Sequence, residues 1–293
     1  MKFGLSVYQT AARYGLLEDT EKPITVGSFI QSIDSIKELG FSHYEILTDP
    51  LMKALKVDER RLLFEKLAEY NEKNNMSMSV HMPFWWIDIS VPDQAIREAS
   101  VNQLITLIKE TEIMNPTHYV IHALQRVTIG QIKRTKLSYA VKNELMEDYY
   151  NTVRDSIRLI SSSIDDSKKI AIENLQQESD YSKLWSLAEE FNLSINYDYG
   201  HQFLAEQNVF KGFDSMWPRI ASIHAHNIII EKTGHGEECV LKDHYALSTG
   251  IIDTSCILEY LKDKDYQGLY VVEVMRKEDA VESARFLKKH GLL

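Results

Sequence analysis

Cysteine is almost absent from this sequence. The chain has 293 residues and two cysteines, Cys239 and Cys256, which form no Cys-x-x-Cys pair. A disulfide scaffold and a thiolate zinc site both need several cysteines at close spacing, so neither is expected. Residues 1–9 carry one lysine and too short an apolar run for a secretory signal peptide. We therefore expect a cytoplasmic protein.

Long apolar runs and phosphate-binding motifs are also missing. No stretch approaches the roughly 18 apolar residues of a membrane helix, so no membrane partner is expected. GxGxxG does not follow the first expected strand, and GxxxxGK[ST] occurs nowhere. The net charge of −10 repels polyanions, because DNA binding draws much of its affinity from lysine and arginine. Duplex DNA is therefore a disfavoured partner, although a local basic patch is compatible with this charge.

Strand and helix patterns alternate from end to end of the chain. The expected strands are residues 3–8, 43–47, 76–80, 119–121, 169–172, 193–198, 220–223 and 268–272. The expected helices are residues 29–39, 58–70, 93–114, 145–162, 181–191 and 278–290. This pattern predicts a (β/α)₈ TIM barrel, with residues 1–293 as a single domain. A doubly wound open sheet with a small second domain is the alternative.

From the third to the eighth, every expected strand ends on a histidine or a carboxylate. Asp198-Tyr-Gly-His201 is the centre of this pattern, because a carboxylate and an imidazole leave the same strand end. In a barrel, all strand ends of one kind lie on one face, where active sites are built. The side chains that would converge there are His81, His122, Glu173, Asp198, His201, His224 and Glu273.

Imidazoles and carboxylates without thiolate suit Zn²⁺, Mn²⁺ or Fe²⁺. One ion uses about four protein ligands at most. The surplus of histidines therefore indicates either more than one metal ion or histidines that contact substrate.

Short motifs follow one another in a distinctive order and spacing through nearly the whole chain. They are His81-Met-Pro83-Phe84, the helix start from Arg97 to Leu104, Val120-Ile-His122, Ile172-Glu173-Asn174, Asp198-Tyr-Gly-His201, His224-Ala-His226-Asn227, Asp243-His244 leading to Leu247, Gly250-Ile-Ile-Asp253 and Val272-Glu273. Together they resemble the xylose isomerase-like TIM-barrel superfamily, which includes sugar isomerases and epimerases and also endonuclease IV (AP endonuclease family 2).

The resemblance implies metal ligands. The set shared by both branches falls on Glu173, Asp198, His224 and Glu273. The endonuclease IV branch adds His81 and His122, which would share Glu173 around a first metal, and His201 with His244 for a third. This chain departs from that branch at Lys242, which replaces an aspartate, with Asp243 one position away. One to three ions, zinc or manganese, are expected.

Two mechanisms use the same pocket. As a hydrolase of a small phosphodiester, similar to the corrinoid-remodelling phosphodiesterases, the protein would bridge two metals with Glu173. As a sugar or sugar-phosphate isomerase or epimerase, it would use one metal, with Glu173 and Glu273 as the proton-transfer pair. A metal-binding protein without turnover is a third class. The phosphodiester hydrolase is favoured, because the surplus histidines suit a multinuclear site.

Some residues have roles that the motifs leave open. Trp85 and Trp86 could stack on substrate or only pack as a lid, and Glu45 could reach substrate or hold a loop. His226 could contact substrate but is better explained as a residue that supports the ligands. His235 could belong to a lid loop. A homo-oligomer is compatible with the sequence.

Overall fold

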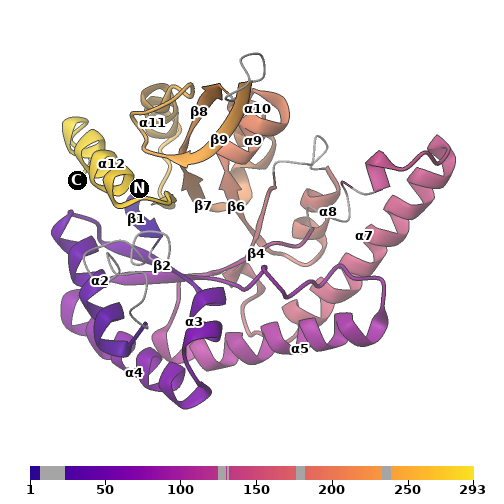
Figure 1. Cartoon of the computed structure of the whole chain (residues 1–293), viewed down its shortest axis with the longest axis horizontal. Coiled ribbons are helices and arrows are strands. Elements are labelled where there is room, and N and C mark those ends of the chain that lie inside the picture. The colour runs from indigo at the N-terminus through magenta and orange to yellow at the C-terminus, as the bar shows by residue number, and fades with distance from the viewer. Residues whose placement is uncertain (7–23, 125–129, 131, 176–181, 233–238) are drawn as a thin grey trace.

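The structure, a computed structural model, describes residues 1–6, 24–124, 130, 132–175, 182–232 and 239–293. Eight parallel strands form a closed barrel in the order β1-β10-β7-β6-β5-β4-β3-β2 (Figure 1). They are β1 (Lys2–Ser6), β2 (His43–Leu47), β3 (Ser77–His81), β4 (Tyr119–Ile121), β5 (Ile170–Glu173), β6 (Ser194–Asp198), β7 (Ile220–Ala225) and β10 (Leu269–Val272). The expected TIM barrel is confirmed, and closure of the sheet excludes the doubly wound alternative.

The barrel strands are buried because both faces of each strand are covered. All four residues of β5 are buried, as are all four of β10. One face packs in the barrel interior and the other against the helices, so strands such as β5 and β10 read as continuous apolar runs. The polar side chain at the carboxyl end of β5, Glu173, therefore stands out in the sequence.

Helices cover the outside of the barrel. They are α2 (Val26–Glu38), α3 (Thr48–Ala54), α4 (Val57–Asn74), α5 (Gln94–Thr111), α7 (Tyr139–Ser161), α8 (Ser182–Glu190), α9 (Tyr199–Glu206), α10 (Val209–Met216), α11 (Thr254–Asp263) and α12 (Lys277–Lys289). Short 3₁₀ turns are η1 (Glu112–Met114), η2 (Ser167–Lys169) and η3 (Trp217–Arg219). No helix in the described ranges combines the length and the apolar character needed to cross a membrane.

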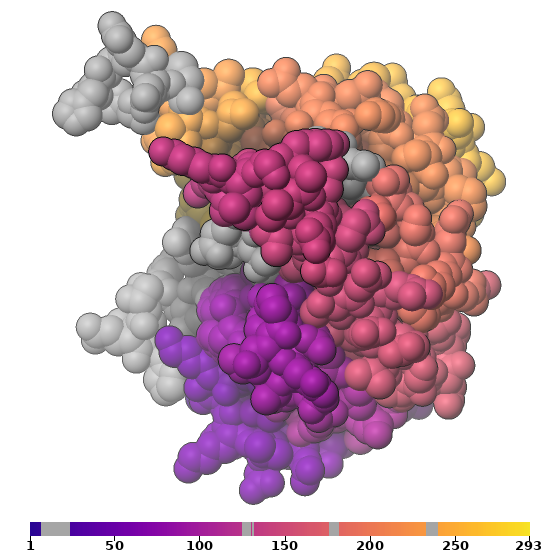
Figure 2. All heavy atoms as spheres, turned by 90° about the vertical axis from the view of Figure 1, so that its right-hand side faces the viewer, coloured from indigo at the N-terminus to yellow at the C-terminus, as the bar shows by residue number. Residues whose placement is uncertain are grey.

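Helix caps explain several boundaries. Asp93 accepts a hydrogen bond from the backbone N–H of Ile96 at 3.1 Å and so begins α5, as the sequence predicts. Asn115, in the left-handed region at φ 48°, ends η1. The long α7 begins at Tyr139, earlier than expected, and lies between α5 and α8. Figure 2 shows its atoms at the front, between the N-terminal and C-terminal parts of the chain.

Two boundaries of the expected elements fall outside the described residues: residues 7 and 8 of the first strand and residue 181 of the fifth helix. Within the described residues, β7 extends to Ala225, two residues further than expected. His224 therefore lies inside a barrel strand and pairs in register with Asp198 of β6. This register places the two side chains on neighbouring strands at the same height.

A two-stranded antiparallel sheet, which the sequence did not predict, interrupts the barrel pattern after β7. It consists of β8 (Asn227–Lys232) and β9 (Cys239–Tyr245). The hairpin lies beyond the carboxyl ends of β6 and β7, close to α9 (Figure 1). It brings His244 from an insertion to the end of the barrel where the other candidate ligands lie.

Candidate metal centre

The expected ligands lie at the carboxyl end of the barrel. They come from β3 (His81), the residue after β4 (His122), β5 (Glu173), β6 (Asp198), α9 (His201), β7 (His224), β9 (His244) and the residue after β10 (Glu273). Three groups have ligand atoms within 4.8 Å of one another: His201, His226 and His244; His81, Glu173 and His224; and Glu173, Asp198, His224 and Glu273. Distant parts of the chain therefore converge on one volume.

Glu173 is at the middle of this volume. Its Oε2 lies 3.3 Å from Nε2 of His81, 3.4 Å from Nε2 of His122 and 3.4 Å from Nδ1 of His224. Its Oε1 lies 3.4 Å from Nδ1 of His201. A single carboxylate thus faces imidazoles from four elements, which is the position of a carboxylate able to serve two ions.

Hydrogen bonds fix which nitrogen of some histidines carries the proton. Nδ1 of His81 lies 3.0 Å from the carbonyl oxygen of Met82, and Nδ1 of His201 lies 3.0 Å from that of Asn174. A carbonyl can only accept, so each Nδ1 carries the proton. Nε2 of each neutral ring is then the lone-pair nitrogen, free to bind metal.

His224 is fixed by a carboxylate instead. Its Nε2 lies 2.8 Å from Oε1 of Glu45, whose Oε2 accepts from the hydroxyl of Ser79 at 2.7 Å. Nδ1 of His224 faces Glu173 and, at 3.1 Å, Oε2 of Glu273. With the proton on Nε2, a lone pair and two carboxylates face one another, an arrangement that needs a proton or a cation between them.

Asp198 uses its two oxygens differently. Oδ1 accepts from the backbone N–H of His201 at 2.7 Å and lies 3.2 Å from Nε2 of His226. The Asp198 backbone N–H donates to Oδ1 of Asn174, whose Nδ2 donates back to the Asp198 carbonyl, both at 2.8 Å. Asp198 is therefore rigidly held, with Oδ2 left over.

Several buried polar atoms of the centre make no hydrogen bond within the described residues. They are Nε2 of His122, Oε2 of Glu173, Oδ2 of Asp198, Nδ1 of His224 and Nδ1 of His244. Nε2 of His226 makes no hydrogen bond either, but it lies 3.2 Å from Oδ1 of Asp198. A buried polar atom without a partner costs about 1–3 kcal/mol, so a cluster of them needs a compensating group. Nitrogen and carboxylate oxygen donors suit Zn²⁺ or Mn²⁺. The residues therefore fit a divalent metal ion.

Charges in the centre are strongly coupled. Burial alone would lower the pKa of His201. The carboxylates of Asp198 and Glu173 outweigh burial and raise the pKa to about 9. Burial opposes ionisation of Glu173 too, yet the histidines, His224 foremost, hold its pKa well below the usual range. The pKa of Glu273 is likewise well below its usual range because His224 and His244 outweigh burial. Without metal, the centre is a network of imidazolium–carboxylate pairs.

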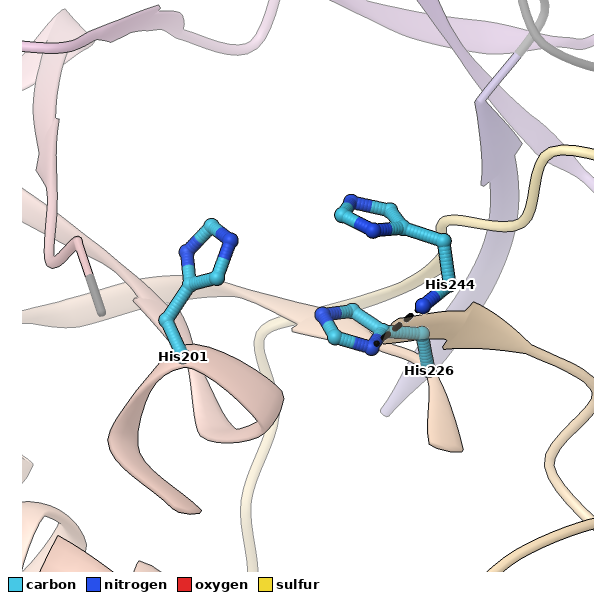
Figure 3. Close-up of side chains that lie close together, drawn as sticks. All are labelled: His201, His226 and His244. Carbon is cyan, nitrogen blue, oxygen red and sulfur yellow. Dashed lines mark hydrogen bonds between the residues drawn. The ribbon is translucent and has the colours of Figure 1, made fainter. Parts of the chain in front are cut away.

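His201, His226 and His244 form a separate corner of the site (Figure 3). The rings of His226 and His244 are stacked, with centroids 4.3 Å apart and planes 9° apart. Nδ1 of His244 lies 3.1 Å from Oδ1 of Asp243. Burial alone would lower the pKa of His244, but the carboxylates of Asp243 and Glu273 outweigh burial and raise the pKa to about 10. Asp243 thus lies beside the histidine that the resemblance assigns to a third metal.

Lys242, which departs from the endonuclease IV pattern, takes no part in the centre. Its ammonium pairs with the carboxylate of Glu231 across the hairpin, on an exposed face. At position 242 this chain therefore lacks the aspartate that the endonuclease IV branch uses for its third metal. The ammonium of Lys242 does not take the place of that aspartate in the centre.

The residues expected at the substrate differ in exposure. Glu45 and His226 are fully buried, and their contact with substrate stays a prediction. Glu45 lies in the middle of β2, not at its end, which is why it points beneath the rim. Trp85 and Trp86 are 46% and 48% exposed, with ring centroids 5.6 Å apart. Their contact with substrate stays a prediction.

The sequence patterns assigned no role to two residues of the site, Asn174 and Asp49. Asn174 holds both Asp198 and His201, and its position directly after Glu173 was the available signal. Asp49 accepts hydrogen bonds from the backbone N–H groups of Phe84 and Trp85 at 3.0 and 3.1 Å, which fixes the segment after His81. His235 lies outside the described residues.

The fold and the site together define a class: a TIM barrel with a histidine- and carboxylate-rich candidate metal centre at the carboxyl ends of its strands. The family model described as "Xylose isomerase-like TIM barrel" matches residues 33–290. The chain belongs to this family.

Known relatives and structures are similar at low identity. An uncharacterized protein of Methanocaldococcus jannaschii is 21% identical over 273 residues, which cover 90% of this chain and 85% of that protein. A D-tagatose 3-epimerase-like protein of solved structure is 20% identical with a TM-score of 0.69, covering 99% of this chain and 97% of that one. D-psicose 3-epimerase from Clostridium cellulolyticum H10, solved with D-tagatose, is 14% identical with a TM-score of 0.66, covering 100% and 99%. At these identities, the structures establish the fold alone.

Proposed function

We propose that the protein is an enzyme that hydrolyses a small phosphodiester at a centre of two or more divalent metal ions. The observation that supports this most is the position of Glu173, whose two oxygens face histidines from four elements at 3.3–3.4 Å. One ion takes about four protein ligands. The histidines and carboxylates around Glu173 exceed that number, and a single-metal reaction would leave His81 and His122 to contact substrate instead of metal.

Eight residues would bind the metal ions, and one of them would also transfer a proton. His81, His122, Glu173, Asp198, His201, His224, His244 and Glu273 would hold the ions. Bound divalent ions would supply Lewis-acid activation of the phosphoryl group and of the attacking water. Of the two proposed catalytic carboxylates, Glu173 and Glu273, Glu273 would also carry a proton to or from substrate, because its side chain is 8% exposed and that of Glu173 only 1%.

The substrate is expected to be small. A net charge of −10 disfavours a long polyanion such as duplex DNA. Trp85 and Trp86 follow His81 closely and expose aromatic surface that could pack on the organic part of a small phosphodiester. A phosphodiester carries a single negative charge, which metal ions can neutralise without a basic surface.

Hydrolysis of bis(4-nitrophenyl) phosphate by zinc- or manganese-loaded protein tests the proposal. The wild type should release 4-nitrophenol, and His122→Ala should reduce the rate at least about 100-fold, because it removes one holder of the shared Glu173. His290→Asn is the control, since His290 ends α12 and its ring contacts Phe286 and Ser255 instead of the ligands. An inactive wild type, or an H122A variant as active as the control, would contradict the proposal.

A second candidate is sugar epimerisation. The supporting observation is that Glu173 and Glu273 lie close together, 3.4 and 3.1 Å from Nδ1 of His224. A sugar bound to an ion at this place would have both carboxylates nearby, and they could serve as its proton-transfer pair. The similar structures named as 3-epimerases add support. Conversion of D-tagatose or D-psicose at C3, retained in part by H122A, would favour this reaction over hydrolysis.

A further inference from the structure

We infer that His226 is a positioning residue of the metal centre, which holds the backbone of His244 and the carboxylate of Asp198, and is not itself a metal ligand. The inference rests on the metal centre of the proposed function but not on its substrate. Three histidines so close together would ordinarily be assigned to one ion (Figure 3). Two features of His226 oppose that assignment.

The first feature is the parallel stack of His226 on His244. The rings are 9° from parallel, with centroids 4.3 Å apart. The lone pair of an imidazole nitrogen lies in the plane of its ring, and zinc binds it at about 2.0–2.1 Å. An ion in the plane of one ring is therefore well out of the plane of the other. One ion cannot take a nitrogen from both rings in this arrangement.

The second feature is the proton on His226. The backbone N–H of His244 donates to Nδ1 of His226 at 3.1 Å, drawn as the dashed line in Figure 3. The carbonyl oxygen of Asn227 also lies near Nδ1, but at 3.5 Å, and the closer group is an N–H that can only donate. Nδ1 is thus the lone-pair nitrogen, and the proton of a neutral ring is on Nε2. A protonated nitrogen does not bind metal. Nε2 lies 3.2 Å from Oδ1 of Asp198 without the geometry of a hydrogen bond, so its proton acts on Oδ1 as a close polar contact and leaves Oδ2 for an ion.

His244 needs such support because its backbone is strained. Its φ of 61° is in the left-handed region, which residues with a side chain rarely adopt. The hydrogen bond and the ring stack from His226 both act on this residue. Gly200 leaves the room that the His226 ring occupies, since a Cβ at that position would overlap the ring. One side chain therefore ties the β8–β9 hairpin to the strand end that bears Asp198.

Two substitutions separate the contacts of His226. In His226→Asn, the amide oxygen can replace Nδ1 as the acceptor for His244, but the shorter side chain does not reach Asp198. In His226→Gln, the amide N–H can reach Asp198, but the acceptor near His244 is lost. His226→Ala removes both contacts. His290→Asn, in which a histidine at the end of α12 is replaced in the same way, is the control, because its ring contacts Phe286 and Ser255 instead of a ligand.

Zinc affinity, measured by competition with a chromophoric chelator, should fall about 10–100-fold in all three His226 variants and stay unchanged in H290N. The ¹⁵N spectrum of histidine-labelled, zinc-loaded wild type should show His226 with Nε2 protonated and Nδ1 unprotonated. A zinc-shifted, unprotonated Nε2 would overturn the inference, as would wild-type affinity in H226A. If a variant fails to fold, the spectrum of the wild type decides. Absence of phosphodiester hydrolysis by the wild type would contradict the proposed function and leave both of these readouts intact.

Discussion

Glu45 accepts a hydrogen bond from Nε2 of His224 at 2.8 Å, deep in the barrel, and so decides that Nδ1 of His224 faces the centre. Both side chains are fully buried. Burial opposes ionisation of Glu45, but the charge of His224 outweighs it and lowers the pKa of Glu45 below its usual value. A carboxylate behind a ligating histidine fixes the ring and increases its basicity. Glu45 therefore acts on the metal centre through His224.

Substitution of Glu45 should weaken metal binding. Glu45→Gln can still accept from His224 but carries no charge, so we expect about a 10-fold loss of zinc affinity; Glu45→Ala leaves Nε2 unpaired, and the loss should approach 100-fold. Ser79→Ala, which removes only the hydroxyl that donates to Glu45, should have a smaller effect. Chelator competition measures the affinities. Wild-type affinity in E45A would show that Glu45 does not support His224.

The metal-free protein should become less stable as the pH rises above 7. The pKa values of His201 and His244 are about 9 and 10 in the folded protein, against about 6.5 in an unfolded chain. A raised folded pKa stabilises the fold fully below about 6.5, and the contribution is lost as the pH rises through 9 to 10. Glu173 and Glu273 stay ionised throughout, because their pKa values lie well below the usual range.

Urea unfolding of chelator-treated protein at pH 7 and pH 9.5 measures this effect. The free energy of unfolding should fall by a few kcal/mol. Zinc-loaded protein should not show the fall, because metal binding favours the deprotonated histidines. Equal stability of the metal-free protein at both pH values would contradict the assigned ion pairs.

Gly200 and His226 should be coupled in a double-mutant cycle. In the wild type, Gly200→Ala pushes a methyl group into the His226 ring and should destabilise the protein by about 1–3 kcal/mol. In the H226A background the ring is absent, and alanine is favoured over glycine in a helix such as α9 by about 1 kcal/mol. The same substitution should then be neutral or stabilising. Equal costs in both backgrounds, measured by urea unfolding, would show that the ring is not what Gly200 accommodates.

The barrel could be predicted because its strands are buried on both faces and end on polar residues, as β5 ends on Glu173 and β6 on Asp198. The β8–β9 hairpin could not be predicted in the same way. The second strand, β9, contains Lys242 and Asp243, two charged residues that are typical of a loop. The apolar residues Ile230 of β8 and Val240 of β9 are exposed, so the hairpin lacks the pattern of a buried strand. Pairing with another strand, and not burial, holds these residues in extended conformation.

Most candidate ligands could be named from strand ends, and His226 could be named as a supporting residue, but the atoms that the supporting residues contact could not be predicted. Glu45 reads as a residue near the rim, yet its register in β2 turns it into the barrel beside His224. His226 accepts from a backbone N–H eighteen positions later in the chain, across a hairpin that the sequence did not reveal. Such contacts depend on three-dimensional pairing, which spacing alone does not encode.

The metal content of freshly purified protein, measured by mass spectrometry against protein concentration, tests the central claim most directly. Sharing of Glu173 by histidines on several sides predicts two or more tightly bound divalent ions per chain, and fewer in H122A. A single ion in both the wild type and H122A would contradict the multinuclear centre.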